Sequence, residues 1–224
     1  MLEIYLDSAN PEGIKSLAPA LTLAGVTTNP SLMAAGGLDL MTLLCRLTEI
    51  LGNDKRFHVQ VVETSVEGMV AEASKLSQLP FDIVVKIPAH AAGLIAIKQV
   101  KQLDIPVLAT AIYTAQQGMM AAMNGADYLA PYLNRIDNLG GNGLQVVNEL
   151  QTLIRQYDLP SKLLVASFKN VHQVLQVLKI GVSAVTLPLD IAQQILATPA
   201  TDMAVEQFNQ EWQAVFPAKK SYES

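Results

Sequence analysis

The feature that most limits how this chain can fold is a repeat of short apolar runs separated by longer amphipathic segments. Eight such runs follow one another: Glu3–Asp7, Gly25–Thr28, Phe57–Val61, Ile83–Ile87, Val107–Ala111, Tyr128–Pro131, Leu163–Ala166 and Ala184–Leu187. Runs that are apolar almost throughout are typical of parallel strands buried on both faces. Segments with a helical pattern lie between them, for example Ser65–Leu79, Ala91–Gln102, Thr114–Asn124 and Val171–Leu178. Eight βα units with short connections predict an α/β fold, a (βα)8 TIM barrel.

An open, doubly wound sheet is the alternative architecture. Its dinucleotide-binding members carry a glycine-rich turn after the first strand, whereas this chain has Asp7-Ser8-Ala9-Asn10-Pro11 there. A length of 224 residues is enough for one sizeable core, so we expect residues 1–224 to form a single domain. Only 5% of the residues are aromatic, which favours an aliphatic α/β core over an aromatic-rich β-sandwich.

The net charge, the first residues and the apolar stretches of the chain indicate which kinds of partner to expect. The net charge is −5 and no block of consecutive basic residues occurs, which argues against nucleic-acid binding. The first residues, 1–5, enter a strand-like run directly, without the basic start and apolar stretch of a signal peptide. No apolar stretch is long enough to span a bilayer. We therefore expect a cytoplasmic protein without a membrane partner, and we expect its one cysteine, Cys45, to lie in the core.

A segment beyond the eighth unit, Pro199–Phe216, predicts an extra C-terminal helix. Its apolar residues recur at steps of three and four and form one stripe: Val205, Phe208, Trp212 and Val215. Two interpretations stay open. The stripe packs against its own barrel, or it docks on a neighbouring subunit, which makes the protein a homo-oligomer. Elsewhere, Asn-Pro pairs at positions 10–11 and 29–30 predict N-caps followed by proline at the first helical position.

Lys86 is the strongest candidate for chemistry. It lies in the run Ile83–Pro88, flanked by apolar residues near the end of the fourth strand. Burial disfavours the ammonium form and lowers its pKa, and a neutral lysine is a nucleophile that can form a Schiff base with a carbonyl. The alternative is a lysine whose charged end reaches water at the rim of the barrel.

Other polar residues at the carboxyl ends of the strands complete the candidate site, because barrel enzymes carry their chemistry there. Each has a structural alternative. Asp7 can pair with a lysine or cap a turn, and Thr110 can simply favour a strand. Strand alternation places Gln60 on the face opposite Val59, where its side chain can hold a water or make a core hydrogen bond. The candidates are Asp7, Thr27, Asn29, Gln60, Lys86, Thr110, Tyr132, Asn134, Arg135, Ser167 and Lys169.

The loops after the sixth and seventh strands suggest an anion pocket. Barrels often hold phosphate near the seventh and eighth strands, so Ser167 and Arg135 form a plausible pair. Arg135 can bind phosphate through its planar fork or form a salt bridge with Asp137. Tyr132 can be an acid/base group or a packing residue.

The histidines do not suggest a metal site. His58, His90 and His172 belong to three different βα units and none has ligand spacing to another. We therefore expect neither a metal nor a cofactor.

Several motifs taken together resemble the transaldolase family. They run along essentially the whole chain: Gly25–Ser31, Ile83–Pro88, Ala130–Tyr132 with Asn134–Asp137, Ala166–Lys169, and Thr186–Asp190. Two positions resemble the fructose-6-phosphate aldolase subgroup in particular. The chain has Gln60 where transaldolases carry a glutamate, and Tyr132 where they typically carry a phenylalanine.

The resemblance implies a class I aldolase that cleaves fructose 6-phosphate through an imine on Lys86. Tyr132 would be the general acid/base, and Gln60 and Thr110 would hold the catalytic water. The remaining candidates would orient the lysine or bind dihydroxyacetone and the phosphate: Asp7, Thr27, Asn29, Asn134, Arg135, Ser167 and Lys169. It also implies a homodecamer of two pentamers, with the helix at 199–216 packed on a neighbour.

Three hypotheses about function follow. The first is the aldolase, which needs no acceptor sugar. The second is a transaldolase, which passes the dihydroxyacetone unit to erythrose 4-phosphate. The third is a non-catalytic barrel that binds sugar phosphates, and it predicts that borohydride traps nothing on Lys86.

Overall fold

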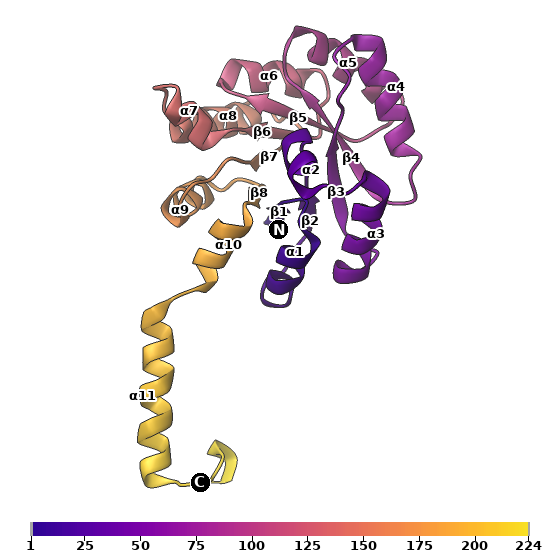
Figure 1. Ribbon diagram of the computed structural model, residues 1–224. Coiled ribbons are helices and arrows are strands. Elements are labelled where there is room, and N and C mark those ends of the chain that lie inside the picture. Colours follow the sequence, from indigo (N-terminus) through magenta and orange to yellow (C-terminus); the bar gives the residue numbers. More distant parts are fainter. Residues whose placement is uncertain (1, 224) are drawn as a thin grey trace.

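The chain folds into a closed barrel of eight parallel strands paired in chain order, as the sequence predicts (Figure 1). The structure is a computed structural model and describes residues 2–223. The strands are β1 (Glu3–Asp7), β2 (Gly25–Thr27), β3 (Arg56–Gln60), β4 (Asp82–Pro88), β5 (Val107–Ile112), β6 (Tyr128–Pro131), β7 (Lys162–Val165) and β8 (Ala184–Leu187). The predicted runs agree with these bounds to within one residue at either end.

Helices follow every strand, and all except the last of them cover the outside of the barrel. They are α1 (Pro11–Leu17), α2 (Pro30–Gly36), α3 (Leu40–Leu51), α4 (Val66–Ser77), α5 (Ala91–Lys101), α6 (Ala115–Met123), α7 (Leu133–Asn138), α8 (Gly143–Gln156), α9 (Val171–Ile180), α10 (Leu189–Leu196) and α11 (Pro199–Val215), with short 3-10 turns η1 (Ala18–Ala20) and η2 (Ser221–Glu223). Both Asn-Pro pairs behave as predicted: Asn10 caps α1 and Asn29 caps α2, each followed by proline. No single helix in residues 2–223 is long and apolar enough to cross a membrane, although the bent pair α2 and α3 passes by length and composition.

Strand alternation divides the core into two parts. In β4, Val85 and Ile87 pack in the large cluster between the strands and the helices, whereas Val84 packs in a small cluster inside the barrel. The members of that inner cluster are Tyr5, Val84, Leu108, Tyr128, Ala130, Leu164 and Ala184. Lys86 is two residues beyond Val84, so its side chain projects to the same inner face, one layer nearer the carboxyl ends of the strands.

The amino-terminal end of the barrel is closed by a polar cluster. Glu3 pairs with Lys162 across the barrel and accepts hydrogen bonds from the hydroxyls of Tyr5 and Tyr128, at 2.8 and 2.9 Å. Arg56 donates to the Tyr128 hydroxyl at 2.9 Å. These contacts fasten β1, β3, β6 and β7 together at the end away from the expected chemistry.

Cys45 is exposed, so the expectation that it lies in the core is wrong. It belongs to α3, whose buried residues are Leu43, Leu44 and Leu47. A helix turns by about 100° per residue, which places Cys45 outside the apolar stripe formed by these three leucines.

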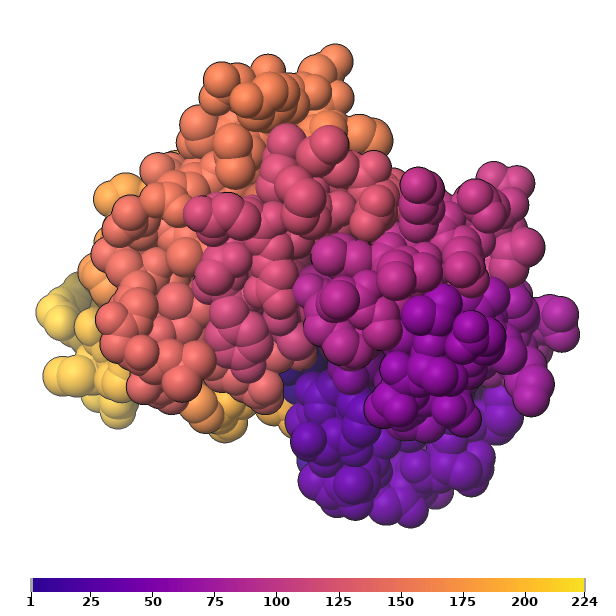
Figure 2. Space-filling model, turned by 90° about the horizontal axis from the view of Figure 1, so that it is seen from above, coloured from indigo at the N-terminus to yellow at the C-terminus, as the bar shows by residue number. Residues whose placement is uncertain are grey.

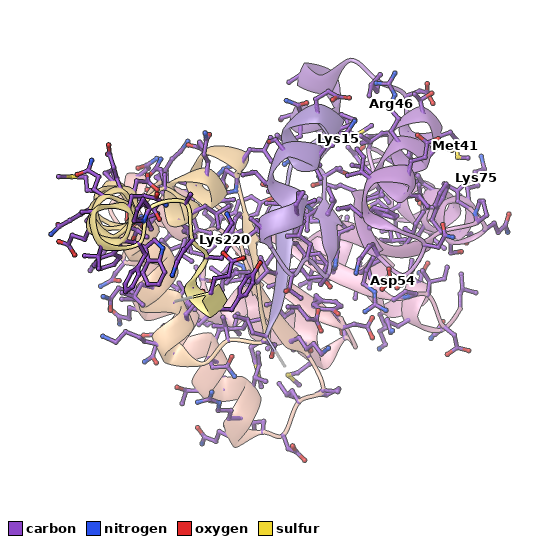
Figure 3. The ribbon with its side chains drawn as sticks, turned by 90° about the horizontal axis from the view of Figure 1, so that it is seen from below. Lys15, Met41, Arg46, Asp54, Lys75 and Lys220 are labelled. Carbon is purple, nitrogen blue, oxygen red and sulfur yellow. The ribbon has the colours of Figure 1, made fainter. Side chains whose placement is uncertain are left out.

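The extra helix is present as α11, and no residue in it is buried. Figure 1 shows it extending away from the barrel, and Figure 2 shows it in yellow at the edge of the molecule. In the view from below, α11 is seen end-on and lies well away from Lys15 of α1 and Arg46 of α3 (Figure 3). The stripe residues Val205, Phe208 and Val215 are 51%, 64% and 68% exposed, so this helix does not pack its stripe against its own barrel.

Candidate active site

A cavity of about 300 Å³ opens at the carboxyl ends of the strands and collects most of the predicted residues. Its polar lining comes from the loops and strand ends of nearly the whole barrel: Asp7, Thr27, Asn29, Lys86, Tyr132, Asn134, Arg135, Asn138, Ser167, Lys169 and Thr186. Leu108, Ala130, Leu164 and Ala166 add apolar surface. Of the eleven candidates, only Gln60 and Thr110 lie outside this lining.

Lys86 reaches the cavity from β4 and is only 5% exposed. Its ammonium donates to the backbone oxygen of Thr28 at 2.5 Å. Burial lowers the pKa of Lys86 below its usual value; the nearby Asp7 carboxylate opposes this shift, and the Arg135 guanidinium adds to it. An amine held in this way is closer to its neutral, nucleophilic form than a lysine in water.

Asp7 is fixed by a short chain of hydroxyl groups. Thr27 donates to the Asp7 carboxylate at 2.7 Å, and the Thr27 and Thr186 hydroxyls lie 2.7 Å apart. Both threonines are buried. The carboxylate is therefore held beside Lys86 by side chains from β2 and β8, and it does not cap the following turn, because Asn10 caps α1.

Tyr132 follows β6 and directs its hydroxyl at Thr110, with 2.9 Å between the two oxygens. Thr110 is fully buried and does not line the cavity itself, so it acts on the site through Tyr132. Burial raises the pKa of Tyr132, while the Thr110 hydrogen bond and the Arg135 charge oppose the rise. The phenol is thus protonated at neutral pH and can serve as a proton donor.

Backbone irregularities accompany these side chains. Ala111, next to Thr110, has a φ of 56°, and the pairing of β5 with β6 shifts register between Ala109 and Ile112. Ser167 has a φ of 68°. Non-glycine residues in this left-handed region cost free energy and gather at functional sites.

Arg135 has no salt bridge among residues 2–223, so the alternative pairing with Asp137 does not occur. Asp137 instead accepts a hydrogen bond from the backbone nitrogen of Gly143 at 2.7 Å. The Arg135 guanidinium lies over the Tyr132 ring, 4.6 Å from its centroid. Arg135 and Lys169 are both exposed at the cavity and can attract an anion.

Gln60 lies in a different position from the rest. It pairs with Lys86 in the register of β3 with β4, yet it lines a second cavity, of about 290 Å³, together with Asn29 and Val59. Asn29 contributes to both cavities, and its side-chain oxygen is occupied by the Leu32 nitrogen at 3.0 Å. The amide hydrogens of Asn29 are therefore the part left for a ligand.

Two polar residues of the lining were not among the candidates. Thr186 is two residues after Ala184 in β8 and therefore shares its face of the strand. Because Ala184 lies inside the barrel, strand periodicity would have placed Thr186 there too. Asn138 lies one helical turn after Asn134 in α7, so it shares a helix face with a predicted residue. Asn138 has no sequence signal of its own apart from this spacing, whereas Thr186 also begins the motif Thr186–Asp190.

A comparison with protein families agrees with the site. The sequence model described as Transaldolase/Fructose-6-phosphate aldolase matches residues 4–223. Enzymes of this kind act on sugar phosphates through a Schiff base. A (βα)8 barrel with a buried lysine in a cavity at the carboxyl ends of its strands has the architecture such chemistry needs, and the chain belongs to the transaldolase/fructose-6-phosphate aldolase family.

Proposed function

We propose that the protein is a class I aldolase that reversibly cleaves fructose 6-phosphate to dihydroxyacetone and glyceraldehyde 3-phosphate. The observation that carries the proposal is Lys86: its amine is buried in the cavity, beside Asp7, and its pKa is lowered by burial. The family supplies the reaction class, and the protonated phenol of Tyr132 supplies the feature that favours an aldolase.

The reaction begins when Lys86 Nζ attacks the C2 carbonyl of the sugar and water is lost to give a protonated imine. The C4 hydroxyl then loses its proton, the C3–C4 bond breaks, and its electron pair moves into the imine to form an enamine. Glyceraldehyde 3-phosphate leaves as the aldehyde. Protonation of the enamine at C3 and hydrolysis of the imine release dihydroxyacetone and the free amine.

The neighbouring side chains divide the remaining work. Tyr132, held by Thr110 at 2.9 Å, exchanges protons with the C4 oxygen and with the catalytic water. We assign Gln60 a role with that water because it is the neighbour of Lys86 in the register of β3 with β4, although its side chain lines the second cavity. Asp7, Thr27 and Asn29 orient the amine and the dihydroxyacetone hydroxyls from β1 and β2.

The phosphate of the substrate is assigned to the side of the cavity formed by the loops after β6 and β7. Arg135 and Lys169 supply positive charge there, and Arg135 has no carboxylate partner in residues 2–223. Asn134 and Ser167 add polar groups to the lining of the same cavity. This assignment is supported by the general tendency of barrels to bind phosphate near the seventh and eighth strands.

The second candidate function is transaldolase activity, in which the enamine attacks erythrose 4-phosphate. The presence of Gln60 and Tyr132 favours the aldolase over it, because these groups manage the water that hydrolyses the imine. The test is release of glyceraldehyde 3-phosphate from fructose 6-phosphate alone, with Lys86→Met as control. Release that depends on Lys86 supports the aldolase, whereas release only after erythrose 4-phosphate is added identifies a transaldolase.

The assembly is also part of the proposal. We infer that α11 packs its stripe on a neighbouring subunit in a homodecamer of two pentamers. The support is the exposure of Val205, Phe208 and Val215 on a helix that has no buried residue. Apolar surface of this extent on one helix is typical of an interaction site.

A further inference from the structure

Gln173, in α9, connects the two loops that bound the phosphate side of the cavity. Its Oε1 accepts a hydrogen bond from the backbone nitrogen of Lys169 at 2.8 Å. Its Nε2 donates to Asn134 Oδ1 at 3.1 Å and to Asp137 Oδ2 at 3.4 Å. One amide thereby links the loop after β7 to helix α7, which follows β6.

The direction of these hydrogen bonds is fixed by the backbone. A peptide N–H can only donate, so the Gln173 atom that faces Lys169 must be the oxygen. The NH2 group must then point to α7, where a carboxylate oxygen of Asp137 also requires a donor. The Lys169 N–H therefore determines which end of the Gln173 amide is oxygen and which is nitrogen.

The orientation of the Gln173 amide in turn fixes the orientation of the Asn134 amide. Because Gln173 donates to Asn134 Oδ1, the NH2 group of Asn134 is the half of that amide available to the cavity it lines. Its two hydrogens have no acceptor within residues 2–223. The backbone of Asn134 is fixed as well, since its nitrogen donates to the Ser167 oxygen at 2.9 Å.

We propose that Gln173 is a positioning residue that holds Asn134 as a hydrogen-bond donor to an anionic oxygen of the substrate. The inference rests on the proposed function in assigning the phosphate to this side of the cavity. Gln173 does not line the cavity, so we assign it no contact with the substrate. Its role is to prevent the Asn134 amide from turning its carbonyl oxygen toward the anion. In that orientation the carbonyl oxygen and the anionic oxygen, both hydrogen-bond acceptors, would repel each other.

The decisive variant is Gln173→Glu. Its carboxylate can still accept from Lys169 N, but its second oxygen faces Asn134 Oδ1 and Asp137 Oδ2 and has no hydrogen to donate. Asn134 is then expected to turn its carbonyl oxygen toward the cavity. Gln173→Met removes all three side-chain hydrogen bonds of this residue without imposing the reversed direction. Gln176→Glu is the matched control, because it adds the same charge to α9 at a side chain that contacts His172 instead of the site.

Sulfate is the probe for the anion site, because it remains doubly charged between pH 5 and pH 8. Its dissociation constant is measured by calorimetry for the full chain and each variant, together with KM and kcat for fructose 6-phosphate. At pH 8 we expect Gln173→Glu to weaken sulfate binding and raise KM about tenfold, the loss of a hydrogen bond to a charged group. Gln173→Met should lose less, and Gln176→Glu nothing. Borohydride trapping of dihydroxyacetone on Lys86 should be unchanged in all three.

The pH dependence separates positioning from packing. As pH falls to 5, the new carboxyl, whose pKa is raised by nearby Asp137, takes up a proton and can donate to Asn134 again. Sulfate binding by Gln173→Glu should therefore recover toward the wild-type value measured at the same pH. Equal losses in the Glu and Met variants without recovery would overturn the inference, as would wild-type binding in Gln173→Glu or absence of sulfate binding in the wild type. Failure of the proposed function would appear separately, as absence of Lys86-dependent release of glyceraldehyde 3-phosphate from fructose 6-phosphate alone in the wild type.

Discussion

The hydroxyl groups of Tyr132 and Thr110 lie 2.9 Å apart, and this hydrogen bond joins a buried strand residue to the mouth of the cavity. Tyr132→Phe removes the acid/base group while keeping the ring under Arg135. We expect cleavage of fructose 6-phosphate to fall by about 10²–10⁴-fold, the range for loss of general acid–base catalysis. Trapping of dihydroxyacetone on Lys86 by borohydride should fall much less, because imine formation depends mainly on the amine.

Tyr113→Phe is the matched control for this prediction. The Tyr113 ring packs edge-on against Tyr132 at 5.8 Å, yet Tyr113 does not line the cavity. Its variant should cleave at close to the wild-type rate. An unchanged cleavage rate in Tyr132→Phe would remove Tyr132 from the mechanism.

The pH dependence of imine formation should move in opposite directions in two variants. Burial lowers the pKa of Lys86, Asp7 raises it, and Arg135 lowers it. Asp7→Asn removes the raising influence, so the acid limb of the trapping rate should shift to lower pH. Arg135→Gln removes a lowering influence, so the limb should shift to higher pH. Dihydroxyacetone carries no phosphate, so loss of an anion contact does not confuse the measurement.

The check is the initial rate of borohydride trapping between pH 5 and pH 10 for the wild type and both variants. Lys169→Gln serves as the control, because it removes a cation of the cavity lining that has no part in the Lys86 pKa shift. Shifts of the same sign in Asp7→Asn and Arg135→Gln would show that their charges do not control the amine.

Periodicity explains why so much of the fold could be predicted. Each strand is buried on both faces, so its apolar run is visible without knowledge of its neighbours. Lys86 could be identified for the same reason, since a lysine interrupts such a run. Cys45 was misplaced because a single apolar residue does not reveal which face of a helix it occupies. Gln173 has no local signal at all, because its role depends on Lys169 and Asn134, which only the folded chain brings to it.

The amino-terminal cluster predicts a pH-dependent contribution to stability. Burial tends to raise the pKa of Glu3, but hydrogen bonds from Lys162, Tyr5 and Tyr128 outweigh it and leave this pKa lowered. A lowered carboxyl pKa stabilises the fold above the unfolded value, about 4.3, and the effect is lost as pH falls through the folded pKa. Glu3→Gln should therefore destabilise the protein by about 1 kcal/mol at pH 7, a modest value because Lys162 is half exposed.

Urea unfolding at pH 7 and near pH 3 measures this difference. We expect the gap between wild type and Glu3→Gln to shrink at the lower pH, because the contribution of a carboxyl with a lowered pKa diminishes as pH falls below its unfolded value. Glu49→Gln on the exposed side of α3 is the control and should change little at either pH. A gap that stays constant between the two pH values would mean that the charge of Glu3 is not what stabilises this end of the barrel.

The exposed stripe of α11 predicts that one charge at its centre disrupts the assembly. Phe208 is 64% exposed on a helix with no buried residue, and Phe208→Glu places a carboxylate where we infer that a neighbouring subunit packs. Burial of that charge without a partner costs several kcal/mol at each contact, so light scattering should report a smaller species than the wild type. The barrel forms its core without α11, so its circular dichroism should be retained. Gln210→Glu adds the same charge about 200° around the helix and should leave the mass unchanged. A wild-type chain that is monomeric, or a Phe208→Glu variant of full wild-type mass, would mean that α11 does not hold the subunits together.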